Sequence, residues 1–172
     1  MKNTLHIIGI VGLPNRYGGF ETLAENLVIY LQNSNFKTYV FAERNDLHKK
    51  NRIYFSATQI LLPFKANGWQ SIIYDSLSIF IAALMGGNLL ILGTSGTFIL
   101  PLIKFFSPNA KFIVNMAGLE WQRSKWGCIA KMVLKINEWA AIRFSHEIIA
   151  DNEGLVEYVQ KTYSVTARYI PY

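Results

Sequence analysis

Charged and aromatic residues gather in one short stretch of the chain, which reads AGLEWQRSKWG. It contains the acid Glu120, the bases Arg123 and Lys125, and the tryptophans Trp121 and Trp126. Arginine and lysine bind phosphate, and the flat faces of tryptophan suit sugar rings. The carboxylate could hydrogen-bond a sugar or accept a proton from its hydroxyl. The alternative is that the tryptophans anchor a loop while the charges form surface pairs.

A glycine-bearing loop is the second candidate site, between an apolar run at 5–8 and a segment of helical periodicity that starts at Phe20. A strand, such a loop and a helix in this order form an anion site. Glycine lets the backbone come close to a ligand, and the first N–H groups of a helix are unpaired. The expected guest is a phosphate or diphosphate, admitted by Gly12, Gly18 and Gly19.

This loop lacks the dinucleotide-binding fingerprint G-x-G-x-x-G. Two residues separate Gly9 from Gly12, and Pro14 follows before the glycine pair that precedes the helix. A loop of this length could fold over a ligand instead of only supporting it. The alternative is a connecting loop whose glycines serve turns alone.

Composition narrows the class of protein. The 172 residues can form one domain with a substantial core, since 51% are hydrophobic. The net charge of +6 favours a phosphorylated ligand or acidic lipid, whereas the scattered Lys and Arg residues disfavour nucleic acid. The single cysteine, Cys128, indicates a reducing compartment, and its apolar helical surroundings predict a buried structural thiol. The three histidines lack metal-ligand spacing, and the first apolar run is too short for a signal peptide.

Apolar periodicity predicts alternating strands and helices along the whole chain. The polar segment 43–52 is expected to be a solvated loop. The apolar stretch 77–92 invites comparison with a membrane span, but the glycines and asparagine at 86–88 interrupt it, so two core elements are expected. Strands are expected at 5–10, 37–42, 89–92, 111–115, 147–150 and 167–170, with one or two within 52–62, and helices at 19–33, 69–84, 96–106, 129–144 and 153–162.

These elements predict an α/β fold with a Rossmann-like, doubly wound parallel sheet. Continuously apolar strands such as 89–92 and 112–114 are typical of parallel strands covered on both faces. Ligands of such sheets bind beyond the carboxyl ends of the strands. Both candidate sites follow predicted strands, so both are expected at this edge.

The predicted helix 129–144 is apolar on most sides, with Lys131, Lys135 and Glu138 as a narrow polar stripe. A basic, aromatic-rich flank of this kind could rest on anionic lipid, although a solvated face of a core helix is the preferred interpretation. Beyond it, Asp151 or Asn152 is expected to cap the next helix.

Three blocks of the sequence, taken together, resemble the amino-terminal domain of bacterial rhamnosyltransferase-type glycosyltransferases of the retaining GT-B class. The blocks are YGGFET at 17–22, GLEWQRSKW at 118–126, and IADN at 149–152 with the closing YIPY. The resemblance covers essentially the whole chain, and the first two blocks together are fairly specific.

The resemblance implies that residues 1–172 form the acceptor-side, Rossmann-like domain of a GT-B enzyme, and that its nucleotide-sugar domain is absent from this chain. The active site would lie in the cleft between the two domains and require no metal or cofactor, and the catalytic residues stay unassigned. The loop of Gly12, Gly18 and Gly19 would approach the donor diphosphate. The acceptor side would be shaped by Tyr17, Glu21, Glu120, Trp121, Arg123 and Lys125.

The same resemblance implies the partners and the location. These are a nucleotide-sugar donor, with dTDP-rhamnose as the expected one, and a lipid-linked saccharide acceptor used in surface-polysaccharide synthesis. The enzyme would be cytoplasmic and peripheral on the inner face of the cytoplasmic membrane, and the isolated domain would be inactive.

Two positions depart from the family pattern. Ala117 stands where many relatives carry His or Asp, which is compatible with a deoxysugar donor, and Ile10-Val11 stands where Thr-Arg is frequent. Two other functions stay open. Glu43, at a predicted strand end, would suit the ribose of a nicotinamide cofactor in an oxidoreductase, and a non-catalytic glycolipid-binding module would need no donor domain.

Overall fold

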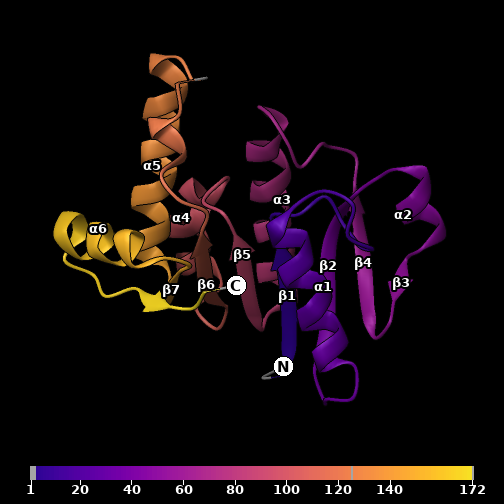
Figure 1. Cartoon of the computed structure of the whole chain (residues 1–172). Helices are drawn as coiled ribbons and strands as arrows, with labels where there is room; N and C mark the ends of the chain where they lie inside the picture. Colours follow the sequence, from indigo (N-terminus) through magenta and orange to yellow (C-terminus); the bar gives the residue numbers. More distant parts are fainter. Residues whose placement is uncertain (1–2, 125, 172) are drawn as a thin grey trace.

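A computed structural model describes residues 3–124 and 126–171, which form one eight-stranded sheet flanked by helices (Figure 1). Neighbouring strands run parallel, except for β3 and β4, which pair antiparallel. The order across the sheet is β3-β4-β2-β1-β5-β6-β7-β8. The chain therefore has the predicted α/β, Rossmann-like fold. The strands are β1 (Thr4–Ile8), β2 (Lys37–Glu43), β3 (Ile53–Tyr54), β4 (Ala57–Leu62), β5 (Asn88–Leu92), β6 (Lys111–Met116), β7 (Glu147–Ala150) and β8 (Arg168–Tyr169).

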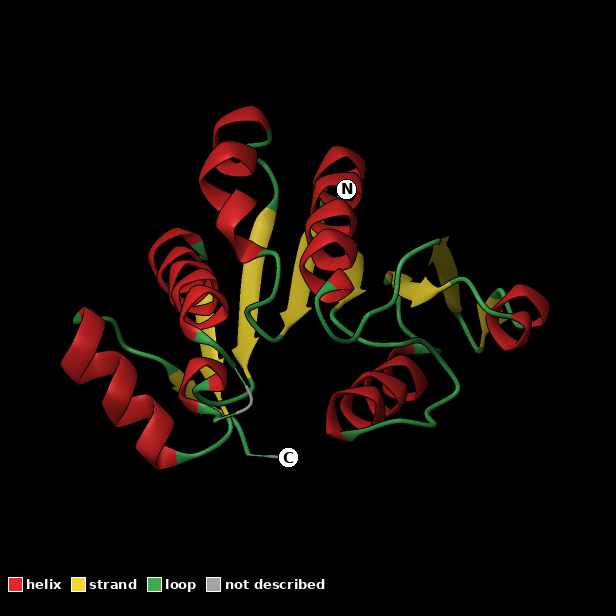
Figure 2. Ribbon diagram, turned by 90° about the horizontal axis from the view of Figure 1, so that it is seen from above, coloured by secondary structure: helices red, strands yellow, loops and turns green. Residues whose placement is uncertain are grey.

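Helices cover both faces of the sheet because the strand side chains alternate between two apolar cores. Ile7 packs with α1 on one face, while its neighbour Ile8 faces the core formed with α3, α4, α5 and α6. Figure 2 shows α1 on one side of the sheet, opposite the other long helices. The helices are α1 (Gly19–Leu31), α2 (Asp46–Lys50), α3 (Gln70–Met85), α4 (Leu100–Phe106), α5 (Cys128–Phe144) and α6 (Glu153–Tyr163), with 3-10 turns η1 (Thr97–Ile99) and η2 (Glu120–Gln122).

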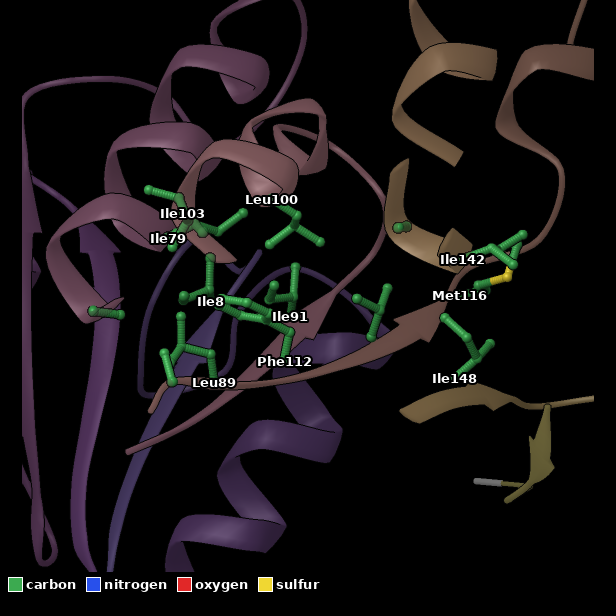
Figure 3. Packing of buried hydrophobic residues seen from close by; sticks show 14 of the residues in the cluster. Ile8, Ile79, Leu89, Ile91, Leu100, Ile103, Phe112, Met116, Ile142 and Ile148 are labelled. Atoms are coloured by element: carbon green, nitrogen blue, oxygen red, sulfur yellow. The ribbon is translucent and has the colours of Figure 1, made fainter. Parts of the chain in front are cut away.

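The larger core joins helices and strands that are far apart in the sequence. In Figure 3, Ile8 of β1 and Leu89 and Ile91 of β5 lie beside Ile79 of α3 and Leu100 of α4. Each of these side chains is almost completely buried. Burial of this kind stabilises a fold by about 1.5–3 kcal/mol for each large aliphatic side chain. This core fixes the positions of α3 and α5 relative to the sheet.

The winding of the sheet reverses between β1 and β5. From β1 the chain proceeds outward through β2 to β4, and α3 then carries it back to β5, on the other side of β1. The two strands lie close where they end, since a Cβ added at Gly9 would meet the Leu92 carbonyl oxygen at 2.0 Å. Gly9 also has a φ of +96°, which side-chain-bearing residues rarely adopt. A crevice at such a reversal is the usual ligand site of open α/β sheets.

Most predicted elements are present, with ends displaced by a few residues, but two predictions were wrong. The segment 43–52 is not only a solvated loop, because it contains α2, whose His48 is buried with its Nδ1 atom 2.8 Å from the Glu43 carbonyl. Cys128 is exposed rather than buried, because it begins α5 where this helix extends past the sheet (Figure 1).

The apolar stretch 77–92 forms two core elements, as predicted. Helix α3 ends at Met85, and β5 begins at Asn88. In the described part of the chain, no helix combines the length and the apolar character needed to cross a membrane.

Candidate functional site

A cavity of about 510 Å³ lies at the carboxyl edge of the sheet, where the winding reverses between β1 and β5. Its walls come from the loops after β1, β4, β5 and β6 and from the first turns of α3 and α5. Both of these helices extend past the sheet at this edge (Figure 1). The volume is within the range of about 300–1,000 Å³ that is usual for small-molecule sites.

The two sequence motifs meet at this cavity. Glu120, Arg123 and Trp126 line it, and the Arg123 guanidinium lies 3.1 Å from the Glu120 carboxylate. Tyr17 of the glycine-bearing loop also lines it, with 67% of its surface exposed. Trp69, immediately before α3, contributes a second tryptophan and is 71% exposed. The site therefore combines aromatic faces with an acid–base pair whose arginine is exposed and whose glutamate is half-buried.

The three glycines that were predicted to admit a phosphate or diphosphate differ in their surroundings. Gly12 is buried, has a φ of +138° and packs against His48 and Ala42, away from the cavity lining. Gly18 is the N-cap of α1, and Gly19 is its first residue. In the described structure the N-cap makes no side-chain hydrogen bond, and the first turn of the helix carries the buried acid Glu21.

Side chains from α1 and β4 hold the glycine-bearing loop in place. Glu21, buried in α1, accepts a hydrogen bond from the Val11 amide at 3.0 Å. Gln59 of β4 accepts from the Leu13 amide and donates to the Leu13 carbonyl, both at 2.8 Å. Glu21 is absent from the cavity lining, so its described contact positions the loop.

Trp121 is absent from the cavity lining and anchors the η2 segment. Its indole N–H donates to the Glu138 carboxylate at 3.1 Å, and Tyr158 and Tyr163 donate to the same carboxylate at 2.7 Å each. Burial and this carboxylate raise the pKa of both tyrosines. Glu138 is only 3% exposed, so its predicted place on a solvated stripe was wrong. Lys135 of that stripe lies over the Trp121 ring, 4.2 Å from its centroid.

Sequence reasoning missed Asp75, which borders the same cavity and is 4% exposed. Burial raises the pKa of this carboxyl well above its usual range, and a hydrogen bond with Ser95 opposes that rise. One signal was available, because Asp75 is the only charged residue in the sequence of α3.

A smaller cavity of about 450 Å³ adjoins the site, with Arg123 and Gly118 in the walls of both. Tyr158 and Asn152 of the α6 region also line it. Asn152 accepts from the Leu155 amide at 2.9 Å, which confirms the predicted cap of that helix. Lys125 lies outside the described residues. The described His, Cys, Asp and Glu residues form no group that could hold a metal ion.

The chain belongs to the family called domain of unknown function DUF1972, whose model matches residues 2–172. No curated protein matches the chain. The matched residues include both sequence motifs and every residue that lines the larger cavity.

Proposed function

We propose that this DUF1972 domain is the acceptor-side half of a retaining GT-B glycosyltransferase. Domains of this family are found in glycosyltransferase-associated proteins. The observation that carries the proposal is the cavity at the winding reversal, where Trp69 and Trp126 accompany the Glu120–Arg123 pair. Aromatic faces with hydrogen-bonding charged groups suit a saccharide, and the exposed guanidinium suits the phosphate of a lipid-linked one.

The amino-terminal turn of α1 is the proposed contact to the donor diphosphate. The helix begins at Gly18–Gly19 beside Tyr17, which lines the cavity, so an anion at this turn would lie next to the acceptor. The helix dipole favours a negative charge at this end of the helix. The donor sugar, with dTDP-rhamnose as the proposed donor, would be held mainly by a second domain, and Ala117 in the cavity lining leaves room for a deoxysugar methyl group.

A membrane surface is the proposed location of the reaction. Helix α5 exposes Ile129, Met132, Ile136 and Trp139, which follow one another at helical spacing. Lys131 lies on the same helix. Apolar residues at helical spacing, accompanied by lysine, suit the inner face of a membrane with anionic headgroups.

An oxidoreductase is less well supported. The Glu43 carboxylate, which would have to bind a cofactor ribose, accepts a hydrogen bond from the Ala66 amide at 2.6 Å. This contact ties β2 to the loop after β4.

The direct test is sugar transfer by the natural full-length protein in membranes, with a panel of nucleotide-sugars and lipid-linked acceptors. Transfer from one donor, with dTDP-rhamnose expected, would support the proposal. No transfer from any donor, with folded protein and verified acceptors, would leave the binding-module and oxidoreductase functions ahead.

Two matched glycine variants test the proposed diphosphate contact. Gly18→Val should abolish transfer without unfolding the domain, because the backbone is extended there and only Glu21 lies near the added carbon. Gly127→Val is the control, since Gly127 is also a helix N-cap and its added carbon meets no described atom within 4 Å. Full turnover by Gly18→Val would remove the loop from the mechanism.

A further inference from the structure

Three polar side chains meet in the wall of the large cavity. Ser71 and Asp75 lie one turn apart on α3, and Ser95 comes from the loop after β5. The Ser71 and Ser95 hydroxyl oxygens are 3.0 Å apart, and Ser95 is hydrogen-bonded to Asp75. The Ser71 hydroxyl also donates to the Gly68 carbonyl at 2.7 Å. All three side chains border the space that a ligand would occupy.

The number of hydrogens in this chain of contacts sets its direction. The Gly68 carbonyl can only accept, so Ser71 gives its single hydrogen to it. The hydrogen bond with Ser95 lowers the pKa of Asp75, so Ser95 gives its single hydrogen to this carboxyl group. Both hydroxyl hydrogens are then used, and the two hydroxyl oxygens, 3.0 Å apart, offer a ligand only lone pairs.

The Asp75 carboxyl group lies in the wall of the cavity and is 4% exposed. Its Oδ1 atom is buried and has no hydrogen-bond partner among the described residues. Buried polar atoms without a partner are rare in folded proteins, so this oxygen is a candidate contact for a ligand in the cavity.

We propose that Asp75, Ser95 and Ser71 form a binding site for a saccharide hydroxyl that donates its hydrogen to them. In the arrangement derived above, the hydrogens of Ser71 and Ser95 are already used, so the two serines offer a ligand only acceptor lone pairs. A hydroxyl fits this site, whereas a methyl ether or a missing hydroxyl leaves the acceptors unpaired. Trp69 and Trp126 line the same cavity and supply the ring faces that a sugar uses. The inference rests on the proposed function in taking this sugar to be the acceptor.

Binding to the 172-residue chain itself tests the site. The probes are the methyl pyranosides of glucose, galactose, mannose and rhamnose, followed by saturation-transfer NMR and by tryptophan fluorescence. At least one should bind, and its analogue with one hydroxyl removed or methylated should bind at least tenfold more weakly. Absence of binding by all four, or equal binding by every deoxy and methyl-ether analogue, would overturn the proposal.

Variants at position 75 separate the hydrogen-bonding role from packing. Asp75→Leu, which keeps the branched shape but has no hydrogen-bonding atom, should lose at least tenfold in affinity. Asp75→Asn should keep binding near the wild-type level, since its amide oxygen remains a hydrogen-bond acceptor. Ser78→Ala is the matched control, because Ser78 lies on the same helix, outside the cavity lining, and donates to the Tyr74 carbonyl at 2.7 Å. Equal losses in the Asn and Leu variants, both folded by circular dichroism, would overturn the role of Asp75 as a hydrogen-bond acceptor.

The same variants distinguish this site from the proposed function. Saccharide binding is measured here without a nucleotide-sugar. If the chain binds saccharides but the full-length protein transfers no sugar, the hydroxyl site is supported and the proposed function is overturned. Undiminished transfer and binding by Asp75→Leu would overturn the hydroxyl site and leave the proposed function standing.

Discussion

Two glycines of the loop after β1 differ in what a side chain would meet, so their substitutions should have different effects. An alanine Cβ at Gly12 would lie 2.5 Å from the His48 ring and 2.8 Å from the Ala42 methyl group, on a backbone with a φ of +138°. We expect Gly12→Ala to lower the free energy of unfolding by about 2–3 kcal/mol, from strain and overpacking. Urea denaturation would measure the loss.

Gly18→Ala provides the comparison for this prediction. The Gly18 backbone is extended, and the Glu21 carboxylate is its one described neighbour, at 3.3 Å. Its stability should therefore stay within about 1 kcal/mol of the wild type. Equal stability losses at the two positions would contradict the difference in packing described here.

Asp75 should make stability depend on pH. Burial raises its pKa, so the folded chain keeps a proton that the unfolded chain releases once the pH exceeds the ordinary aspartate value. The contribution of Asp75 to the free energy of unfolding therefore falls as pH rises from about 4 toward the raised pKa. Asp75→Asn removes this contribution. We expect the stability of the variant relative to wild type to increase between pH 4.5 and pH 8 in urea denaturation, whereas a constant difference would show an ordinary carboxyl.

Among the secondary-structure elements, η2, α5 and α6 are joined through one buried carboxylate. Glu138 on α5 accepts from Trp121 of η2 and from Tyr158 and Tyr163 of α6. A glutamine there keeps the shape but places an amide donor among three donors. We expect Glu138→Gln to cost about 2–3 kcal/mol, as is usual when a buried charged acceptor is lost.

Hydrogen exchange would locate this effect. Amides of η2 and of the carboxyl-terminal half of α6, which carries Tyr158 and Tyr163, should exchange faster in Glu138→Gln, while those of β1 and β2 stay protected. Trp121→Phe removes a single donor and should cost about 1 kcal/mol. Unchanged exchange in η2 would mean that other contacts hold this segment at the cavity.

At the scale of the whole molecule, the exposed apolar residues of α5 predict membrane binding. The double variant Ile129→Ser with Met132→Ser removes two exposed side chains from one helix face. If both enter the lipid, each contributes about 1.5–3 kcal/mol, so binding should weaken at least tenfold. Co-sedimentation with phosphatidylglycerol vesicles would measure this.

A second pair of exposed residues serves as the control. Phe80 and Leu84 are exposed on α3, also one turn apart. Serine at both positions should leave vesicle binding near the wild-type level. Equal weakening by both double variants would indicate nonspecific adsorption rather than a surface centred on α5.

The sequence predicted the order and type of most elements, because short continuous apolar runs such as β5 are typical of buried parallel strands. It missed α2, whose buried contact is a histidine packed on Gly12, where no apolar period is visible. The site was predicted in part. Glu120 and Arg123 lie in one sequence motif, so they could be predicted together. The role of Asp75 depends on its hydrogen bond with Ser95, a residue on another segment that lies next to it only after folding. The role of Glu138 was hidden because its tyrosine partners lie on another helix.

Both borders of the described sheet are short, and this has a consequence for how the molecule behaves when concentrated. The border strands β3 and β8 are two residues long each, and β8 carries Arg168 within 3.7 Å of Glu147. Long, flat, uncharged borders invite further strands from neighbouring molecules, which leads to aggregation. Here such a strand would find few unpaired backbone groups. Intermolecular β-sheet growth should therefore be slow as long as the domain stays folded.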